Sequence, residues 1–419
     1  MRLVKAFAGL TIGSLMVACA MQPTVRFVDL SPPLTATEAI PEHLLLNVGV
    51  KVLDANIPES YKVRTALNIT DEIRRAEANY IAHFAKDLLQ STGNWGAVRV
   101  LPRDSNAVDV TISGTILHSD GERLIVAIKV QDARGALWLE DEFETLASKF
   151  AYSENIPQNV DPFQSMYKAV ADGMYQYQAG LSASDIREIR TTAELLFAQE
   201  FSPDVYSDHL VKDDKAGTVR ITRMPNEDDA MLQRVRQIRE REYLFIDTLD
   251  EYYGDFANRM YPSYQKWREG SYGDAIAYRE ERNKARQKLI AGSLMVVGGA
   301  AMQRSSANVT EYAGYAGVIG GAGEVLGAIQ ARANLTLHGE VLRELGVSAA
   351  AEISPHTLEL ENATYSLMGS VDEQYTELKR ILRRLFYEDY QLPLPDDITD
   401  SAIDQELANE VLKTADARE

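Results

Sequence analysis

Hydrophobic and polar residues alternate along the first third of the chain with two distinct periods. Apolar residues recur at intervals of three and four in residues 71–90 and 162–177, which predicts two helices with one buried face each. A period of two, with turn residues between the last three segments, predicts strands near 47–53, 98–101, 108–117, 123–131 and 137–144. The order strand, helix, four strands, helix predicts an α+β unit over residues 43–180, in which helices pack on a mainly antiparallel sheet.

From residue 181 the apolar spacing becomes mostly helical, so residues 181–334 are expected to form a second, helical domain. A helix over 184–201 opens this domain, with Ser184 as its N-cap. Residues 216–221 follow as a short strand that pairs with 205–210. The fold class that we predict is therefore α+β, with a helical body after the sheet.

A long helical region begins after Asn226, which is expected to cap it, and Pro262 is expected to interrupt it. The stripe of apolar residues in this region is typical of a coiled-coil contact with a partner, or of a helical hairpin inside the chain. Tyrosines also gather between residues 243 and 278, either as a binding surface for peptide or glycan or as the lining of a helix–helix contact. The stripe steps by three and four through Ile246, Leu249, Tyr253, Phe256 and Met260.

Residues 289–331 are rich in glycine and poor in charge, and we predict a helical hairpin there, with a turn near 304–308. Six glycines in the second arm cost about 1 kcal/mol each relative to alanine, so close packing against another helix must offset about 6 kcal/mol. The segment resembles the glycine-zipper stretches of bacterial outer-membrane lipoproteins. The residues expected to pack on the neighbouring helix are Ala313, Ala316, Gly320, Gly323 and Gly327.

Insertion of this hairpin into a membrane is the alternative. The second arm, residues 312–331, is long enough to span a bilayer. It carries Glu324 near its middle, however, which costs about 2.5–3.5 kcal/mol in the hydrocarbon core. A buried or oligomeric hairpin is therefore the interpretation that we favour.

A small region of strands and one amphipathic helix is expected over residues 335–393, and residues 394–419 are expected to be an acidic tail. Strand-like runs lie within 335–342 and 354–368, and the helix covers 371–390. A basic cluster on that helix either docks on an acidic neighbour or pairs with glutamates of the same helix. The cluster consists of Lys379, Arg380, Arg383 and Arg384.

The first residues have a basic start and an apolar run that ends at Cys19, the one cysteine of the chain. Residues 1–18 are therefore expected to be a secretory signal peptide. The run Leu-Met-Val-Ala-Cys at residues 15–19 resembles the bacterial lipoprotein box, which implies acylation of Cys19, for example with palmitate. The two residues after Cys19, Ala20 and Met21, are not aspartate, and the enteric sorting rule then implies a lipid anchor in the outer membrane that faces the periplasm. Residues 19–42, rich in Pro, Thr and Ser, are expected to be an extended tether.

The net charge of −19 argues against a nucleic-acid partner and against charge-driven binding to anionic lipid. No G-x-S-x-G elbow, P-loop or H-E-x-x-H pair occurs, and the six histidines have no metal-ligand spacing. We therefore predict no catalytic residue, no metal and no cofactor. A hydrolase of cell-wall polymers built on two of the 62 acidic side chains is an alternative, because such pairs arise by chance.

The element order of residues 43–180 is similar to that of a family of periplasmic lipoprotein domains, which includes the TolB amino-terminal domain and the curli-export channel lipoprotein. The resemblance rests on residues 48–53, the amphipathic helix after them, the segment DVTISGTI at 109–116 and the meander that follows. Members of this family build complexes or pores in the cell envelope, which implies a protein that is not an enzyme.

These patterns together predict a lipid-anchored envelope protein with a structural or assembly role. Its partners would be the membrane, through the lipid, and other proteins or further copies of the chain. A membrane-inserting or channel-forming component that uses the glycine-rich hairpin is the first alternative, and the carboxylate-based hydrolase is the second.

Overall fold

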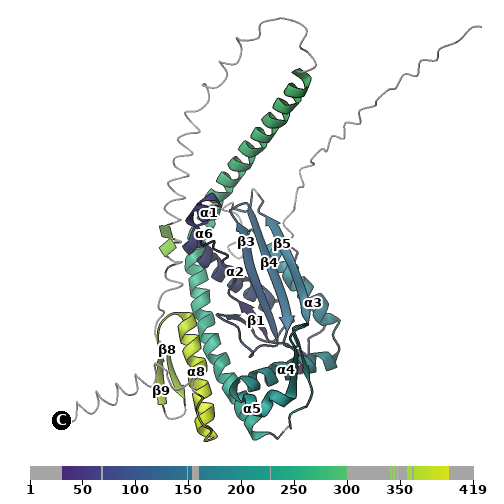
Figure 1. Cartoon of the computed structure of the whole chain (residues 1–419), viewed down its shortest axis with the longest axis vertical. Coiled ribbons are helices and arrows are strands. Elements are labelled where there is room, and N and C mark those ends of the chain that lie inside the picture. The colour runs from purple at the N-terminus through teal and green to yellow at the C-terminus, as the bar shows by residue number, and fades with distance from the viewer. Residues whose placement is uncertain are drawn as a thin grey trace, which may run out of the picture.

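The computed structural model shows an α+β chain in which a five-stranded sheet and several helices pack beside one very long helix (Figure 1). The structure describes residues 31–67, 69–148, 150–152, 160–226, 228–299, 340–341, 343–344, 347, 356–360 and 363–395.

The five strands follow the spatial order β2-β1-β3-β4-β5. Strand β1 pairs in parallel with both β2 and β3, whereas β3, β4 and β5 form an antiparallel meander. The sheet is therefore mixed, and the expectation of a mainly antiparallel sheet was wrong for its first three strands. Helix α2 returns the chain between β1 and β2, a crossover that parallel neighbours require. The strands are β1 Val48–Lys51, β2 Val98–Leu101, β3 Val110–Ser119, β4 Arg123–Asp132 and β5 Leu137–Leu146.

One face of this sheet is buried and the other is largely open. Helices α2, Asp71–Ser91, and α3, Gln164–Ala179, cover the buried face and lie behind the strands in Figure 1. The side chains that point toward them are mostly apolar, as the alternation predicted. Those on the other face are mostly polar, and they include Lys51, Ser113 and Lys129. The short helix α1, Tyr61–Ala66, precedes α2.

Helix α4, Ala183–Phe201, begins one residue earlier than expected, because Ser182 and not Ser184 is the N-cap. The Ser182 hydroxyl accepts a hydrogen bond from the Asp185 N–H, and the Asp185 carboxylate accepts one from the Ser182 N–H. This reciprocal capping box fixes the start of the helix.

A short antiparallel hairpin follows, formed by β6, Leu210–Asp213, and β7, Thr218–Ile221. The expected partner of β7, residues 205–210, was wrong. Most of that segment belongs to the short helices α5, Pro203–Tyr206, and η2, Ser207–His209. Another 3-10 turn, η1, covers Glu42–Leu44.

Helix α6, Ala230–Gly299, contains 70 residues and continues through Pro262, which was expected to interrupt it. Its first N–H groups, those of Met231 and Leu232, donate to the Asp229 carboxylate, so Asp229 and not Asn226 is the cap. A proline inside a helix costs about 3 kcal/mol. Packing on both sides of the proline offsets this cost. A buried cluster joins α6 to α2, and it contains Phe256, Ala257, Met260 and Tyr264 of α6 with Ile73, Ala76 and Tyr80 of α2.

The predicted apolar stripe of α6 is buried inside the chain, where α6 packs on α2, α4, β2 and α8. Three of the tyrosines in this region, Tyr243, Tyr253 and Tyr264, are also buried, which fits the lining of helix contacts. Helix α8, Val371–Asp389, follows a hairpin of β8, His356–Leu360, and β9, Ala363–Leu367. Residues 340 and 341, inside an expected strand-like run, are helical.

One buried core runs from Leu46 in the first segment to Phe386 in α8, and it continues across the expected domain boundaries at 180 and 334. Two residues of the basic cluster on α8 pair within that helix, since Arg380 contacts Glu377 and Arg384 contacts Glu388. Lys379 instead reaches Glu200 of α4 at 2.5 Å. Within the described ranges, no helix has the length and apolar character needed to cross a membrane.

Candidate functional site

A buried ion pair between Arg268 and Asp161 fixes helix α6 to the body near the point where the helix leaves it, which we call the root of α6. The exposed fractions of the two side chains are 1% and 0%, and their closest nitrogen and oxygen atoms are 2.8 Å apart. Asp161 precedes α3, and it also accepts hydrogen bonds from the Tyr80 hydroxyl of α2 at 3.2 Å and from the Phe163 N–H at 2.9 Å. One carboxylate therefore ties together α6, α2 and the start of α3.

A second buried carboxylate, Glu77 of α2, lies in the same cluster. It accepts hydrogen bonds from the hydroxyl of Tyr264 on α6 and from that of Ser119 at the end of β3. Arg74, one turn earlier in α2, lies 3.4 Å from the Glu77 carboxylate. The Glu77 side chain thus adds the sheet to the elements that hold α6.

The Arg268 guanidinium is enclosed by rings, with its Cζ atom 4.1 Å from the ring centre of Tyr264, 5.4 Å from that of Phe163 and 5.7 Å from that of Tyr80. Burial alone would lower the pKa of Arg268, but Asp161 and the neighbouring tyrosines raise it well above its usual value. Arg268 is therefore a permanent cation. Burial raises the pKa of Tyr80 and Tyr264 well above 10.0, and the nearby carboxylates add to the effect. The cluster around Arg268 and Asp161 is closed to solvent, so its role is structural, and we call it the clamp of α6.

The turn between β3 and β4 makes the next contact with α6. A Cβ atom on Gly121 would lie 1.8 Å from the Arg268 carbonyl oxygen, so only glycine lets the two backbones approach this closely. The Tyr152 hydroxyl donates to the Gly121 carbonyl at 2.5 Å, and Arg279 of α6 pairs with Glu122 of the turn. Beyond this level α6 leaves the rest of the body, as Figure 1 shows.

A third buried carboxylate, Glu242, holds the lower part of α6. It accepts hydrogen bonds from the Ser105 hydroxyl at 2.8 Å and from the Tyr375 hydroxyl of α8 at 2.5 Å. Burial raises its pKa, an effect that Lys379 and the two hydroxyls oppose. The clamp at Arg268 and this contact together fix α6 over most of its first 50 residues.

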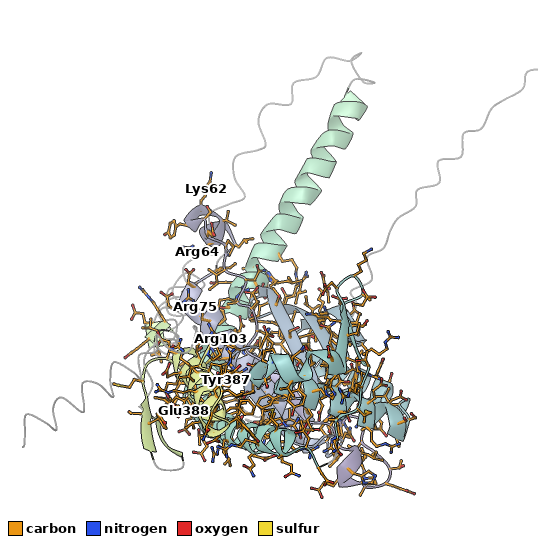
Figure 2. All side chains as sticks on the ribbon, turned by 60° about the horizontal axis from the view of Figure 1, so that its bottom comes forward. Lys62, Arg64, Arg75, Arg103, Tyr387 and Glu388 are labelled. Carbon is orange, nitrogen blue, oxygen red and sulfur yellow. The ribbon has the colours of Figure 1, made fainter. Side chains whose placement is uncertain are left out.

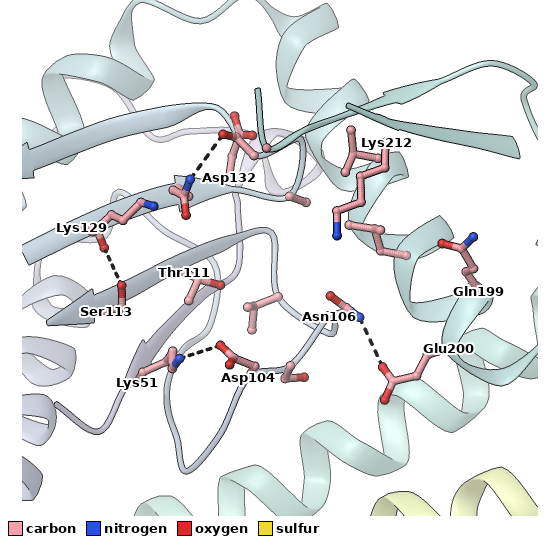
Figure 3. Close-up of a pocket in the computed structure, with 18 residues that line it drawn as sticks. Lys51, Asp104, Asn106, Thr111, Ser113, Lys129, Asp132, Gln199, Glu200 and Lys212 are labelled. Atoms are coloured by element: carbon pink, nitrogen blue, oxygen red, sulfur yellow. Dashed lines mark hydrogen bonds and ion pairs between the residues drawn. The ribbon is translucent and has the colours of Figure 1, made fainter. Parts of the chain in front are cut away.

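A polar groove lies on the open face of the sheet, away from α6. It encloses about 800 Å³, and its walls come from α4 and the β6–β7 hairpin (Figure 3). Lys51, Lys129 and Lys212 line it, together with hydroxyl and amide side chains. Figure 2 shows the side chains of the body, with Lys62 and Arg64 on the protruding helix α1.

The sequence pattern predicted neither the clamp nor the groove. Arg268 continues the apolar stripe of α6 four residues after Tyr264, and a charge on such a stripe was the signal that could have identified it. No group of His, Cys, Asp or Glu that could hold a metal occurs in the described part of the chain. Cys19 and the five small residues expected to pack, Ala313, Ala316, Gly320, Gly323 and Gly327, lie outside the described residues, as does most of the glycine-rich hairpin.

Comparison with known proteins found no match of this chain to a protein-family model, to a curated protein or to a solved structure.

Proposed function

We propose that this chain is a lipid-anchored envelope protein with an assembly role, in which the α+β body holds the root of α6 and α6 carries the glycine-rich segment to its partner. The partner is a second copy of the chain, joined through the small-residue face of residues 313–327. The anchor is the acylated Cys19.

The observation that carries this proposal is the length and fixation of α6. Seventy residues at 1.5 Å each make a helix of about 105 Å, far longer than the body needs for its own packing. The Arg268 clamp and the turn at Gly121 fix the helix where it leaves the body. Residues 300–331 follow this helix directly in the sequence, and their pattern predicts close helix packing.

The sequence motif at Cys19 supports the anchor. Two or more acyl chains hold a protein stably on a membrane, whereas one chain gives only marginal binding. A Cys19→Ser chain is expected to take up no labelled fatty acid and to leave the membrane after a carbonate wash. Normal labelling of that variant would contradict the anchor.

Multi-angle light scattering after size-exclusion chromatography tests the assembly role, on the chain from residue 20 onward. We expect a species larger than one chain, and Gly323→Leu should shift it toward the monomer because the new side chain separates the paired helices. The matched control is Gly273→Leu, the same change on the same chain at a site where a Cβ atom has open space. A monomer in the unsubstituted chain, or equal effects of both substitutions, would contradict the proposal.

A further inference from the structure

The five-stranded sheet has one covered edge and one open edge. At the first edge α6 packs on β2, where Arg99 pairs with Asp247 of α6 at 2.6 Å. Strand β5 forms the second edge, on the far side of the sheet from α6 (Figure 1). Within the described ranges, no other strand pairs with the outer side of β5. The 10 residues of β5 therefore offer their outer backbone groups to a partner over about 33 Å.

The hydrogen bond from the Ala147 N–H to the Glu122 carbonyl, at 2.8 Å, fixes which backbone groups of β5 point outward. Pairing alternates along an antiparallel strand, so the residues of β5 that pair with β4 are 139, 141, 143 and 145. The N–H and C=O groups of residues 140, 142 and 144 therefore point away from the sheet. The Glu142 N–H donates to the Asp141 carboxylate at 2.8 Å, an exposed contact that an incoming carbonyl oxygen can replace.

The side chains along this edge are acidic on both faces of the strand. A Cβ atom on Gly173 of α3 would lie 3.6 Å from the Leu139 side chain, so Leu139 faces the helices. By alternation, Glu140 and Glu142 lie on the open face of the sheet, and Asp141 lies on the opposite face. All three acids are exposed, and none of them forms an ion pair with any residue that the structure describes.

A hollow of about 740 Å³ runs beside Glu140 and Glu142 along the open face of the sheet. Its charged lining is acidic on balance. Lys51 already pairs with Asp104 at 2.6 Å, which leaves Lys129 of β4 as the one cation of this lining without an ion pair to a described residue. The hollow therefore attracts a cationic side chain that lies on the open face next to β5. The charged residues that line it are Asp54, Glu140, Asp141 and Glu142, with Lys51 and Lys129.

We propose that β5 accepts an extended basic segment of a partner protein as an additional strand, with lysine or arginine side chains opposite Glu140 and Glu142. In this mode of recognition, main-chain hydrogen bonds supply affinity and the side chains at alternate positions supply specificity. Opposite charges on neighbouring strands are favourable, whereas like charges are unfavourable.

The same charges exclude strand β5 of a second copy as the occupant. Antiparallel pairing of two β5 strands would bring Glu140, Asp141 and Glu142 of one chain beside the same acids of the other, and such like-charge contacts are unfavourable. The partner at this edge is therefore a different protein with a basic segment. The proposal is independent of the lipid anchor and of α6.

Fluorescence anisotropy with a labelled octapeptide of alternating lysine and threonine tests the proposal, on the chain from residue 20 onward. This chain is expected to bind the peptide and not its glutamate–threonine analogue. Glu140→Gln with Glu142→Gln should weaken binding about fivefold, the combined effect of two exposed charge pairs. The matched control is Glu240→Gln with Glu251→Gln, which changes the net charge equally at exposed positions on α6.

Two further analogues of the peptide test the backbone pairing without any change to the protein. Methyl groups on the backbone nitrogens of all the lysines remove the N–H groups from one edge of the extended peptide, and methyl groups on those of all the threonines remove them from the other edge. Because β5 pairs with a single edge, one analogue is expected to bind about tenfold more weakly than the parent peptide, whereas the other keeps most of its affinity.

The proposal is overturned if the basic peptide does not bind, which is the result expected of acids that only prevent pairing at the edge. It is also overturned if both glutamine pairs weaken binding equally. Equal binding of the parent peptide and both methylated analogues would overturn it as well, because the edge would then attract any polycation without forming a strand.

Discussion

The clamp at the root of α6 gives the sharpest energetic prediction. Asp161→Asn leaves the Arg268 cation buried without its counter-charge, and Arg268→Met leaves the Asp161 carboxylate buried without its cation. Each single change should lower the free energy of unfolding by about 3–5 kcal/mol, the usual cost of breaking a buried pair. Independent effects would then add to about 6–10 kcal/mol.

The double variant should cost much less than this sum. With both charges gone, the asparagine carbonyl can accept from the Phe163 N–H, as one Asp161 oxygen does. The asparagine NH2 takes the place of the other oxygen and can donate to the Tyr80 hydroxyl, and methionine fills the space between the rings. The main loss is the cation's contact with three aromatic rings, about 0.5–2 kcal/mol, plus imperfect hydrogen bonds of about 1 kcal/mol. We therefore expect about 2–3 kcal/mol for the double variant, and a coupling energy of at least about 3 kcal/mol.

Urea unfolding followed by circular dichroism measures the four proteins of this cycle, all without the lipid anchor. Arg75→Met, at the exposed arginine that directly follows Arg74 in α2, is the control for loss of a cation and should change stability by under about 0.5 kcal/mol. Additive effects of Asp161→Asn and Arg268→Met would refute the clamp, because residues that do not interact show no coupling.

Three further predictions follow from neighbouring contacts. Gly121→Ala should destabilise the chain by about 1–3 kcal/mol or more in thermal unfolding, because the new methyl group meets the α6 backbone. Gly273→Ala, at a position with open space, should instead stabilise the chain by up to about 1 kcal/mol. Equal effects of the two substitutions would contradict the close approach at Gly121. Burial raises the pKa of Tyr80, Tyr167 and Tyr264, so these tyrosines keep their protons in the folded chain. Their contribution to stability is therefore complete below pH 10.0, and above it the free energy of unfolding falls by up to about 1.4 kcal/mol per tyrosine and pH unit. Phenolate absorbance of these tyrosines that rises near pH 10.0 without loss of the circular dichroism signal would contradict this. Burial also raises the pKa of Glu242, so the native state loses stability as pH rises above 4.5 through that pKa. Glu242→Gln should remove this loss, so the stability of the variant relative to the unsubstituted chain should increase from pH 4.5 to neutral pH. Urea unfolding that shows no such increase would contradict the prediction.

Local patterns predicted most of the elements. Strand β2 has the expected bounds, and α2 differs from the expected helix by one residue, because alternation and helical spacing report burial directly. Strand direction was not predictable in the same way. A short strand reads alike in parallel and antiparallel pairing, so only the crossover through α2 reveals that β1 is parallel to its neighbours.

The continuity of α6 and the clamp could not be read from local patterns. Proline penalises a helix locally, but packing of Met260 and Tyr264 against α2 is a tertiary effect that overrides it. Asp161 lies in a connecting segment without periodicity, more than one hundred positions before Arg268, so no spacing rule joins the two. The polar groove on the open face of the sheet similarly brings together strands, α4 and a hairpin that are far apart in the sequence.

The proposed assembly role requires α6 to be one straight helix that continues through Pro262 and out of the body. Electron–electron double resonance tests this most directly, with Cys19 replaced by serine and spin labels on cysteines placed at Asp255, which is exposed, and at Ala291 near the far end of α6. A continuous helix predicts a single narrow distance near 54 Å, at about 1.5 Å per residue. A much shorter or broadly spread distance would mean that the helix breaks or folds back, and would contradict the arm and the assembly role that we derive from it.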